Sequence, residues 1–187
     1  GNPTTLAQPL PLALDMGTSS VRAALYDGNA RPLSRMSAKI LRSLAVTADG
    51  GSEIDADEAL AQVVAAIDAV LKKAKRVRGE IKYVASCAFW HSLVGVDARG
   101  KPTTKVLGWA DTRSRKYTEV LRNRFDETAV HNRTGARFHS SFWPATLTWL
   151  RREFPDPFSK TDPWLPPSAH IAMPLFCLAG TSRSIAS

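Results

Sequence analysis

Near the start of the chain, two apolar segments are joined by a short polar turn, and this feature constrains the fold most. The first apolar run covers residues 12–14. The second covers residues 21–26 and ends at the turn pair Asp27-Gly28. Apolar runs separated by a few small polar residues predict antiparallel strands joined by a tight turn. We therefore expect a β-hairpin over residues 12–26.

The turn of this hairpin carries groups that suit a bound phosphate. From Asp15 onward it reads Asp-Met-Gly-Thr-Ser-Ser-Val-Arg. Gly17 lets the backbone approach a ligand, and amide groups with the hydroxyls of Thr18 and Ser19 can surround an anion. Asp15 can hold hydrated Mg²⁺, and Arg22 can offset phosphate charge. The Walker loop differs, because it needs Gly-Lys-Ser/Thr at a helix start. An ordinary hairpin turn is the competing interpretation.

Composition is typical of a globular domain. The 187 residues are 44% hydrophobic and 22% charged, with a net charge of +8. This length fits one domain, or one domain and a fragment. No run approaches the roughly 18 apolar residues of a membrane span, so we expect no membrane partner. The densest basic run, residues 72–78, falls at the end of an expected helix, where cations complement the helix dipole. We therefore expect no nucleic-acid partner.

The two ends of the chain and its cysteines add further expectations. Residues 1–10 read as a disordered or tag-like start, and residues 1–14 lack the positive leading segment of a signal peptide. Cys87 and Cys177 lie in apolar runs, which predicts buried free thiols and fits a cytoplasmic location. The domain itself is expected to cover residues 11–187.

Hydrophobic periodicity predicts the remaining elements. We expect strands at residues 32–41, 81–88 and 93–96, and helices at 55–75, 111–125 and 143–154. Asp55 followed by Glu58 is close to a capping box. The proline-rich stretch at 155–167 reads as a surface connection. This order predicts a mixed sheet with a crossover helix, an α/β layer architecture that is not simply doubly wound.

Two aromatic and polar segments indicate a possible sugar site. Trp90 and His91 follow a predicted strand, and an aromatic beside an imidazole suits the apolar and polar edges of a sugar. Trp109, Asp111 and Arg113 cluster before a predicted helix, where they can read hydroxyls or a carboxylate. Structural alternatives stay open: His91 as a hydrogen-bonding structural residue, Asp111 as a helix cap and Arg113 as a solvated cation.

Taken together, these segments resemble the FGGY family of carbohydrate kinases, and most of all the branch that includes gluconate kinases. The similarity covers about residues 12–187. The matching segments are Asp-Met-Gly-Thr-Ser-Ser-Val-Arg at 15–22, Trp-His-Ser-Leu-Val-Gly-Val-Asp at 90–97, Trp-Ala-Asp-Thr-Arg at 109–113, and the stretch at 135–150, which includes Thr-Leu-Thr-Trp-Leu.

The resemblance implies a fold, a reaction and a set of site residues. The fold would be the N-terminal ribonuclease-H-like domain of the actin and sugar-kinase superfamily, an α/β mixed sheet with flanking helices. The reaction would transfer the γ-phosphoryl group of ATP, with Mg²⁺, to a hydroxyl of a sugar or a gluconate-like acid. The phosphate and Mg²⁺ would face Asp15, Gly17, Thr18, Ser19 and Arg22, with Asp15 as metal ligand, and the sugar would face Trp90, His91, Trp109, Asp111, Arg113 and His139.

Departures from the family pattern concern the end of the chain. The family's catalytic base and second lobe would lie beyond Ser187, so we expect a truncated portion that is inactive alone and that needs a C-terminal lobe from the same or a separate chain. Pro166, Pro167 and Pro174 disfavour the regular helix that the family has there. The alternative function is a non-catalytic binding module that keeps the fold, and a homodimer is possible.

Overall fold

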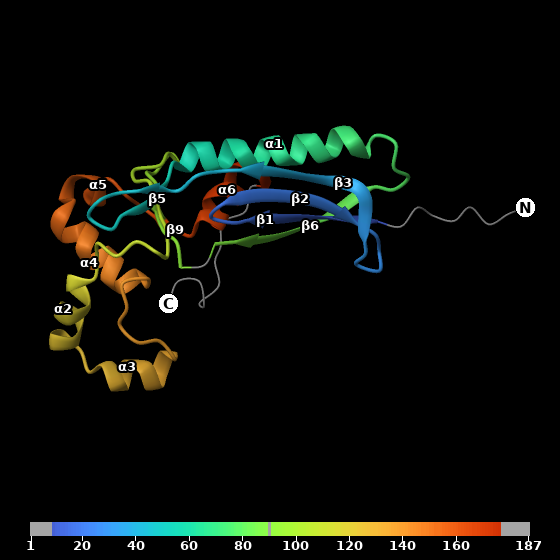
Figure 1. Cartoon of the computed structure of the whole chain (residues 1–187). Helices are drawn as coiled ribbons and strands as arrows, with labels where there is room; N and C mark the ends of the chain where they lie inside the picture. Colours follow the sequence, from blue (N-terminus) through green and yellow to red (C-terminus); the bar gives the residue numbers. More distant parts are fainter. Residues whose placement is uncertain (1–8, 90, 177–187) are drawn as a thin grey trace, which may run out of the picture. The chain divides into compact units, whose positions relative to one another are not determined.

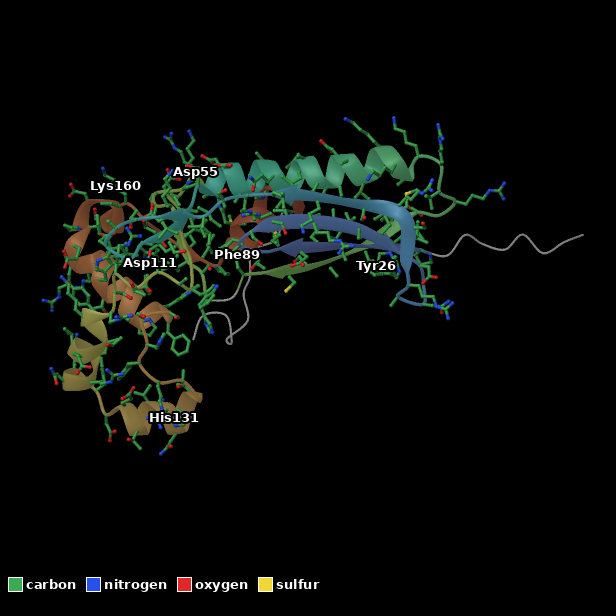
Figure 2. All side chains as sticks on the ribbon, in the orientation of Figure 1. Tyr26, Asp55, Phe89, Asp111, His131 and Lys160 are labelled. Atoms are coloured by element: carbon green, nitrogen blue, oxygen red, sulfur yellow. The ribbon has the colours of Figure 1, made fainter. Side chains whose placement is uncertain are left out.

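The computed structural model describes residues 9–89 and 91–176 (Figure 1). The chain divides into two compact units. The first unit contains residues 1–42 and 60–88, and the second contains residues 43–59 and 89–187. Across the described ranges, no helix is both long enough and apolar enough to cross a membrane.

The first unit is built on a four-stranded mixed sheet, as expected. Its strands are β1 (Leu10–Met16), β2 (Ser20–Tyr26), β3 (Pro32–Leu41) and β6 (Ile81–Ala88), in the order β3-β2-β1-β6. β1 pairs antiparallel with β2, which confirms the hairpin, and β2 pairs antiparallel with β3. β6 lies parallel to β1. A parallel neighbour requires a crossover connection, and helix α1 supplies it.

Helix α1 (Ala56–Ala74) begins after Asp55, as predicted. The Asp55 carboxylate accepts hydrogen bonds from the amides of Asp57 and Glu58 at 3.1 and 3.0 Å. From residue 60 onward α1 runs along one face of the sheet (Figure 1). Val63, Ala66 and Val70 of this stretch are buried, whereas Val64 and Leu71 are exposed. Strand alternation turns the large apolar side chains of β1 and β2 to that buried face: Leu10, Leu12, Leu14, Met16, Val21, Ala23 and Leu25.

The other sheet face carries small and polar side chains. Ala13 and Asp15 of β1 alternate with the buried residues, as does Arg22 of β2, whereas Ala24 points to this face and is buried as well. Cys87 is exposed, so the expectation of a buried thiol was wrong for this residue; Cys177 lies outside the described residues. The reason is position, because β6 is the edge strand of this sheet and is exposed along most of its length.

The second unit contains two small sheets. One has the order β4-β5-β8, from β4 (Ala45–Val46), β5 (Ser52–Ile54) and β8 (Val106–Leu107). The other pairs β7 (Val94–Gly95) with β9 (Trp164–Leu165). The regular strand β7 is therefore shorter than the strand expected at 93–96. Isolated bridges at Leu93 and Val96 extend the pairing by one residue at each end. These strands position the loops that carry the candidate sugar-site residues.

Short helices form the rest of the second unit, around an aromatic core. They are α2 (Lys116–Arg124), α3 (Glu127–Thr134), α4 (Trp143–Glu153), α5 (Pro155–Ser159) and α6 (Pro167–Phe176). α4 confirms the predicted helix at 143–154. α2 begins five residues later than predicted. One core cluster joins Leu93, Leu107, Tyr117, Trp143, Trp149 and Leu150.

Four elements of the second unit correct the sequence-based expectation. α3 was not expected, although Asp126 caps it by accepting from the amides of Thr128 and Ala129 at 2.9 and 3.1 Å. α5 and β9 lie in the stretch expected to be only a surface connection. α6 forms despite its prolines: Pro167 occupies the first turn, where a proline is tolerated, whereas Pro174 lies inside the helix and removes one backbone hydrogen bond.

Candidate functional site

The predicted phosphate site is a hairpin end with two opposite charges side by side. Asp15 and Arg22 are direct partners in the antiparallel pairing of β1 and β2. Both are exposed, on the sheet face opposite the one that α1 covers. Within the described residues, neither side chain forms an ion pair or hydrogen bond. Both are therefore available to a ligand.

The turn itself leaves amide groups available. The amide of Gly17 donates to the carbonyl of Ser20 at 2.9 Å, and a Cβ at Gly17 would lie only 3.2 Å from that oxygen. Glycine therefore fits this close turn. The amides of Thr18 and Ser19 donate to no group in the described part of the chain. Such amides can bind an anion.

A hollow of about 300 Å³ lies beside this hairpin, and its lining includes residues that the sequence did not point to. In the parallel register of β1 and β6, Asp15 faces Cys87 and Leu14 faces Ser86. Tyr26 lines the hollow as well. In the sequence, Ser86 and Cys87 are only the end of a predicted strand. Nothing local to them shows that this strand pairs with β1, some 70 residues earlier.

A row of side chains crosses this sheet face with excess positive charge. Asp15 pairs with Arg22, and Arg22 pairs in turn with Lys39 on β3. Lys39 is exposed and unpaired within the described residues. Two like charges directly opposite one another on a sheet repel.

In residues 9–89 and 91–176, no group of three or more His, Cys, Asp or Glu side chains is placed to hold a metal ion by itself.

On the sugar side, the structure brings His91, Trp109 and His139 together around residues 139–142. The ring of His91 lies 4.7 Å from that of Phe142, and the ring of His139 lies 5.8 Å from it, centroid to centroid. The Ser141 hydroxyl donates to the carbonyl of Trp109 at 2.9 Å. Trp90 falls outside the described residues.

His91 has an unusual backbone conformation. Its φ is 55°, in the left-handed region that non-glycine residues rarely adopt. Such strain is often found where a side chain must be aimed at a ligand. The partly buried imidazole is aimed at Phe142.

A second hollow, of about 340 Å³, lies beside Trp109 and His139. Trp109 keeps 54% of its surface exposed, although large aromatic side chains are usually much more buried. Arg115 and Arg122 of the α2 region also line this hollow, together with Ser141. An exposed aromatic face with nearby hydrogen-bond donors suits a polyhydroxylated ligand.

Asp111 and Arg113 belong to a different cluster and do not line this hollow. The Arg113 guanidinium donates to the carboxylates of Asp111 and Glu53, each at 2.6 Å. It also lies 4.7 Å from the Trp149 ring centroid. Burial opposes the charge of Arg113, but the hydrogen bonds to Asp111 and Glu53 outweigh it and raise its pKa. Asp111 is therefore no cap of α2, and Arg113 is not a solvated cation.

This cluster seats the turn that carries Trp109. Asp111 accepts from the Ser52 amide at 3.1 Å, and the amide of Thr112 donates to the Gly50 carbonyl at 3.0 Å. A Cβ at Gly50 would come within 2.2 Å of the Thr112 hydroxyl oxygen, and one at Gly51 within 2.9 Å of the Arg113 guanidinium carbon. Glycine is required because the two loops touch, a contact that the sequence does not reveal.

Comparison with known sequences gives consistent matches over nearly the whole chain. A sequence model described as "FGGY family of carbohydrate kinases, N-terminal domain" matches residues 10–187. The chain is 24% identical over 165 residues to a gluconokinase of Bacillus subtilis (strain 168), which covers 88% of this chain and 31% of the relative.

Comparison with solved structures shows the same fold. A gluconate kinase from Lactobacillus acidophilus matches with a TM-score of 0.79 at 22% identity, covering 89% of this chain and 33% of that one. A xylulose kinase from Rhodospirillum rubrum matches with a TM-score of 0.83 at 21% identity, covering 88% and 33%. The fold is thus the ribonuclease-H-like one of sugar kinases, and the chain spans about a third of the length of these relatives.

Proposed function

The chain belongs to the FGGY family of carbohydrate kinases, and from this premise we propose that the full-length protein transfers the γ-phosphoryl group of ATP to a hydroxyl of a sugar or sugar acid. One observation carries the proposal: Asp15 and Arg22 are exposed side by side, and neither is paired with any residue that the structure describes. The free amides of Thr18 and Ser19 lie in the turn that joins their strands. This combination of carboxylate, guanidinium and amides matches the needs of a metal-bound triphosphate.

The residues of the hairpin fit Mg²⁺ and phosphate in complementary ways. Mg²⁺ is commonly bound by one or two carboxylates together with substrate phosphates, so the exposed Asp15 carboxylate suits it. When bound, the metal would neutralise phosphate charge. Arg22 would donate to phosphate oxygens, and the Thr18 and Ser19 amides would orient the terminal phosphate. Gly17 keeps the turn tight enough for this approach.

We assign the sugar to the hollow beside Trp109. Trp109 would stack on the carbon face of the sugar, while His91 and His139, with Trp90, would supply polar contacts. Asp111 and Arg113 would contribute by holding the Trp109 turn against the Gly50–Gly51 loop, because their polar atoms bind each other and Glu53. A gluconate-like acid is the favoured substrate, supported by the likeness to gluconokinase.

The rest of the active site would come from a C-terminal lobe. The relatives are about three times as long as this chain, which leaves room for a second lobe that carries the catalytic base. On this proposal the 187-residue chain does not turn over ATP alone. The protein would act in the cytoplasm on a soluble substrate.

ADP release by the full-length protein tests this function, across a panel of gluconate, xylulose and glycerol. We expect release with at least one of them, and a loss on the order of 100-fold for Asp15→Asn, because the metal loses its anchor. Asp68→Asn is the matched control, since Asp68 is exposed on α1 and unpaired within the described residues. Absence of ADP release with every sugar, polyol and aldonate tested would refute the proposed function.

A further inference from the structure

Two arginines line the hollow beside Trp109, and their surroundings differ. Arg115 immediately precedes α2, and Arg122 lies two helical turns further on. Arg115, Thr118 and Arg122 are separated by three and four residues, the spacing that places side chains on one face of a helix. Both guanidinium groups are therefore candidates to meet an anionic ligand.

Arg122 is committed to other groups. Its Nη1 donates to Glu119 at 2.5 Å, its Nε to Glu127 at 3.1 Å and its Nη2 to the Phe138 carbonyl at 3.0 Å. The hydrogen bonds to Glu127 and Glu119 raise its pKa. Two carboxylates thus offset its charge, and little of its hydrogen-bonding capacity remains for a ligand.

The backbone of Arg115 is fixed by a hydrogen bond, whereas its side chain contacts no described polar group. Its carbonyl accepts from the Thr118 hydroxyl at 2.7 Å, and Thr118 is buried. The guanidinium is exposed and forms no hydrogen bond or ion pair with any described residue. Arg115 therefore gives the hollow one positive charge that no ion pair with a described residue offsets.

The other groups of the hollow complement this charge. Trp109 offers an exposed aromatic face. The Nδ1 of His139 accepts from the Ser141 amide at 3.0 Å, so in the neutral ring the hydrogen is on Nε2, which can donate. A flat apolar face and two donors, one of them charged, match a polyol chain that ends in a carboxylate.

From this arrangement we propose that Arg115 is the specificity-determining residue that selects a carboxylate-bearing substrate, by binding its acid end beside Trp109. The ligand class is the sugar acids, in preference to neutral polyols of the same length. The inference rests on the proposed function, because it assigns the substrate class of the same sugar site.

Two matched ligands and three proteins test this proposal. Gluconate and glucitol differ only in a carboxylate and a hydroxymethyl group, and their binding to the full-length protein is measured by calorimetry. The proteins are the wild type, Arg115→Gln and the control Arg133→Gln. Arg133 is exposed on α3, is unpaired among the described residues and does not line the hollow.

We expect the wild type and Arg133→Gln to bind gluconate at least about tenfold more tightly than glucitol, since a charged hydrogen bond is worth that much or more. In Arg115→Gln this preference should fall by about tenfold, with glucitol binding unchanged. A preference that Arg115→Gln retains, or that the wild type lacks, overturns the proposal.

The same proteins in the ADP-release assay separate the two hypotheses. Arg115-dependent gluconate binding without ADP release from any sugar would support the binding assignment and refute the kinase function. ADP release in the presence of gluconate, with the same Michaelis constant for gluconate in Arg115→Gln as in the wild type, would support the kinase function and refute the role given to Arg115.

Discussion

Asp15 and Arg22 lie directly opposite each other on β1 and β2, yet within the described residues they form no ion pair. Opposite charges at such positions usually contribute about 0.2–1 kcal/mol to a sheet. Here that contribution is not realised. The unpaired charges are better explained by a ligand than by stability of the sheet.

Arg22→Gln should therefore separate activity from stability. We expect activity of the full-length protein to fall on the order of 100-fold, because phosphate charge loses a bidentate donor. The free energy of unfolding should change by less than about 0.5 kcal/mol, since an exposed, unpaired side chain is removed. ADP release and urea unfolding measure the two quantities, with Arg76→Gln, also exposed, as control. A large loss of stability would indicate a structural role instead.

Asp111→Asn should mainly destabilise. The substitution leaves Arg113 buried beside Glu53 alone and weakens the bond to the Ser52 amide. Removing one partner of a buried ion pair costs about 3 kcal/mol. Urea unfolding of the 187-residue chain measures this cost, and the exposed Asp156→Asn should change it by less than about 0.5 kcal/mol. Equal stability of the two variants would show that the cluster is not what seats the Trp109 turn.

Arg122→Gln should loosen α3. None of its side chains is fully buried, although Val130 packs against a core cluster, so polar contacts such as the one from Arg122 to Glu127 help to hold it. Hydrogen exchange of the α3 amides should become about tenfold faster, because local opening loses a charged hydrogen bond. Hydrogen exchange followed by mass spectrometry resolves α3. Arg124→Gln, on α2 like Arg122, provides the comparison. Unchanged exchange in α3 would contradict the role given to Arg122.

Stability should fall on acidification through His170. Burial lowers the pKa of His170 below its ordinary value of 6.5, and the charge of Asp57 opposes this only in part. Between the lowered pKa and 6.5, the unfolded chain binds a proton that the folded chain does not, so stability decreases as pH falls through this window. Well above pH 6.5 the effect is absent, because neither state then binds this proton.

Urea unfolding at pH 7.5 and pH 5.5 measures this dependence. The wild type should lose more stability between the two values than His170→Gln, which cannot titrate at this position. Parallel losses in the two proteins would rule out His170 as the source.

Much of the first unit could be predicted from the sequence, because its signals are local. The alternation of β1 and β2, the Asp55 cap and the apolar stripe of α1 are all patterns within a few residues. In the second unit local signals were less reliable. The helix expected at Asp111 begins at Lys116, because Asp111 binds Ser52 and Arg113 in place of capping.

By itself, then, the sequence determined the hairpin, the mixed sheet and the family. Only the tertiary structure decided which charged residues are available to a ligand. Asp15 with Arg22 and Asp111 with Arg113 look equivalent in the sequence, each an acid and an arginine in a turn. The second pair binds Glu53, which is distant in sequence, whereas the first has no such partner among the described residues. Long-range contacts of this kind depend on how strands and loops pack, and local sequence patterns do not encode them.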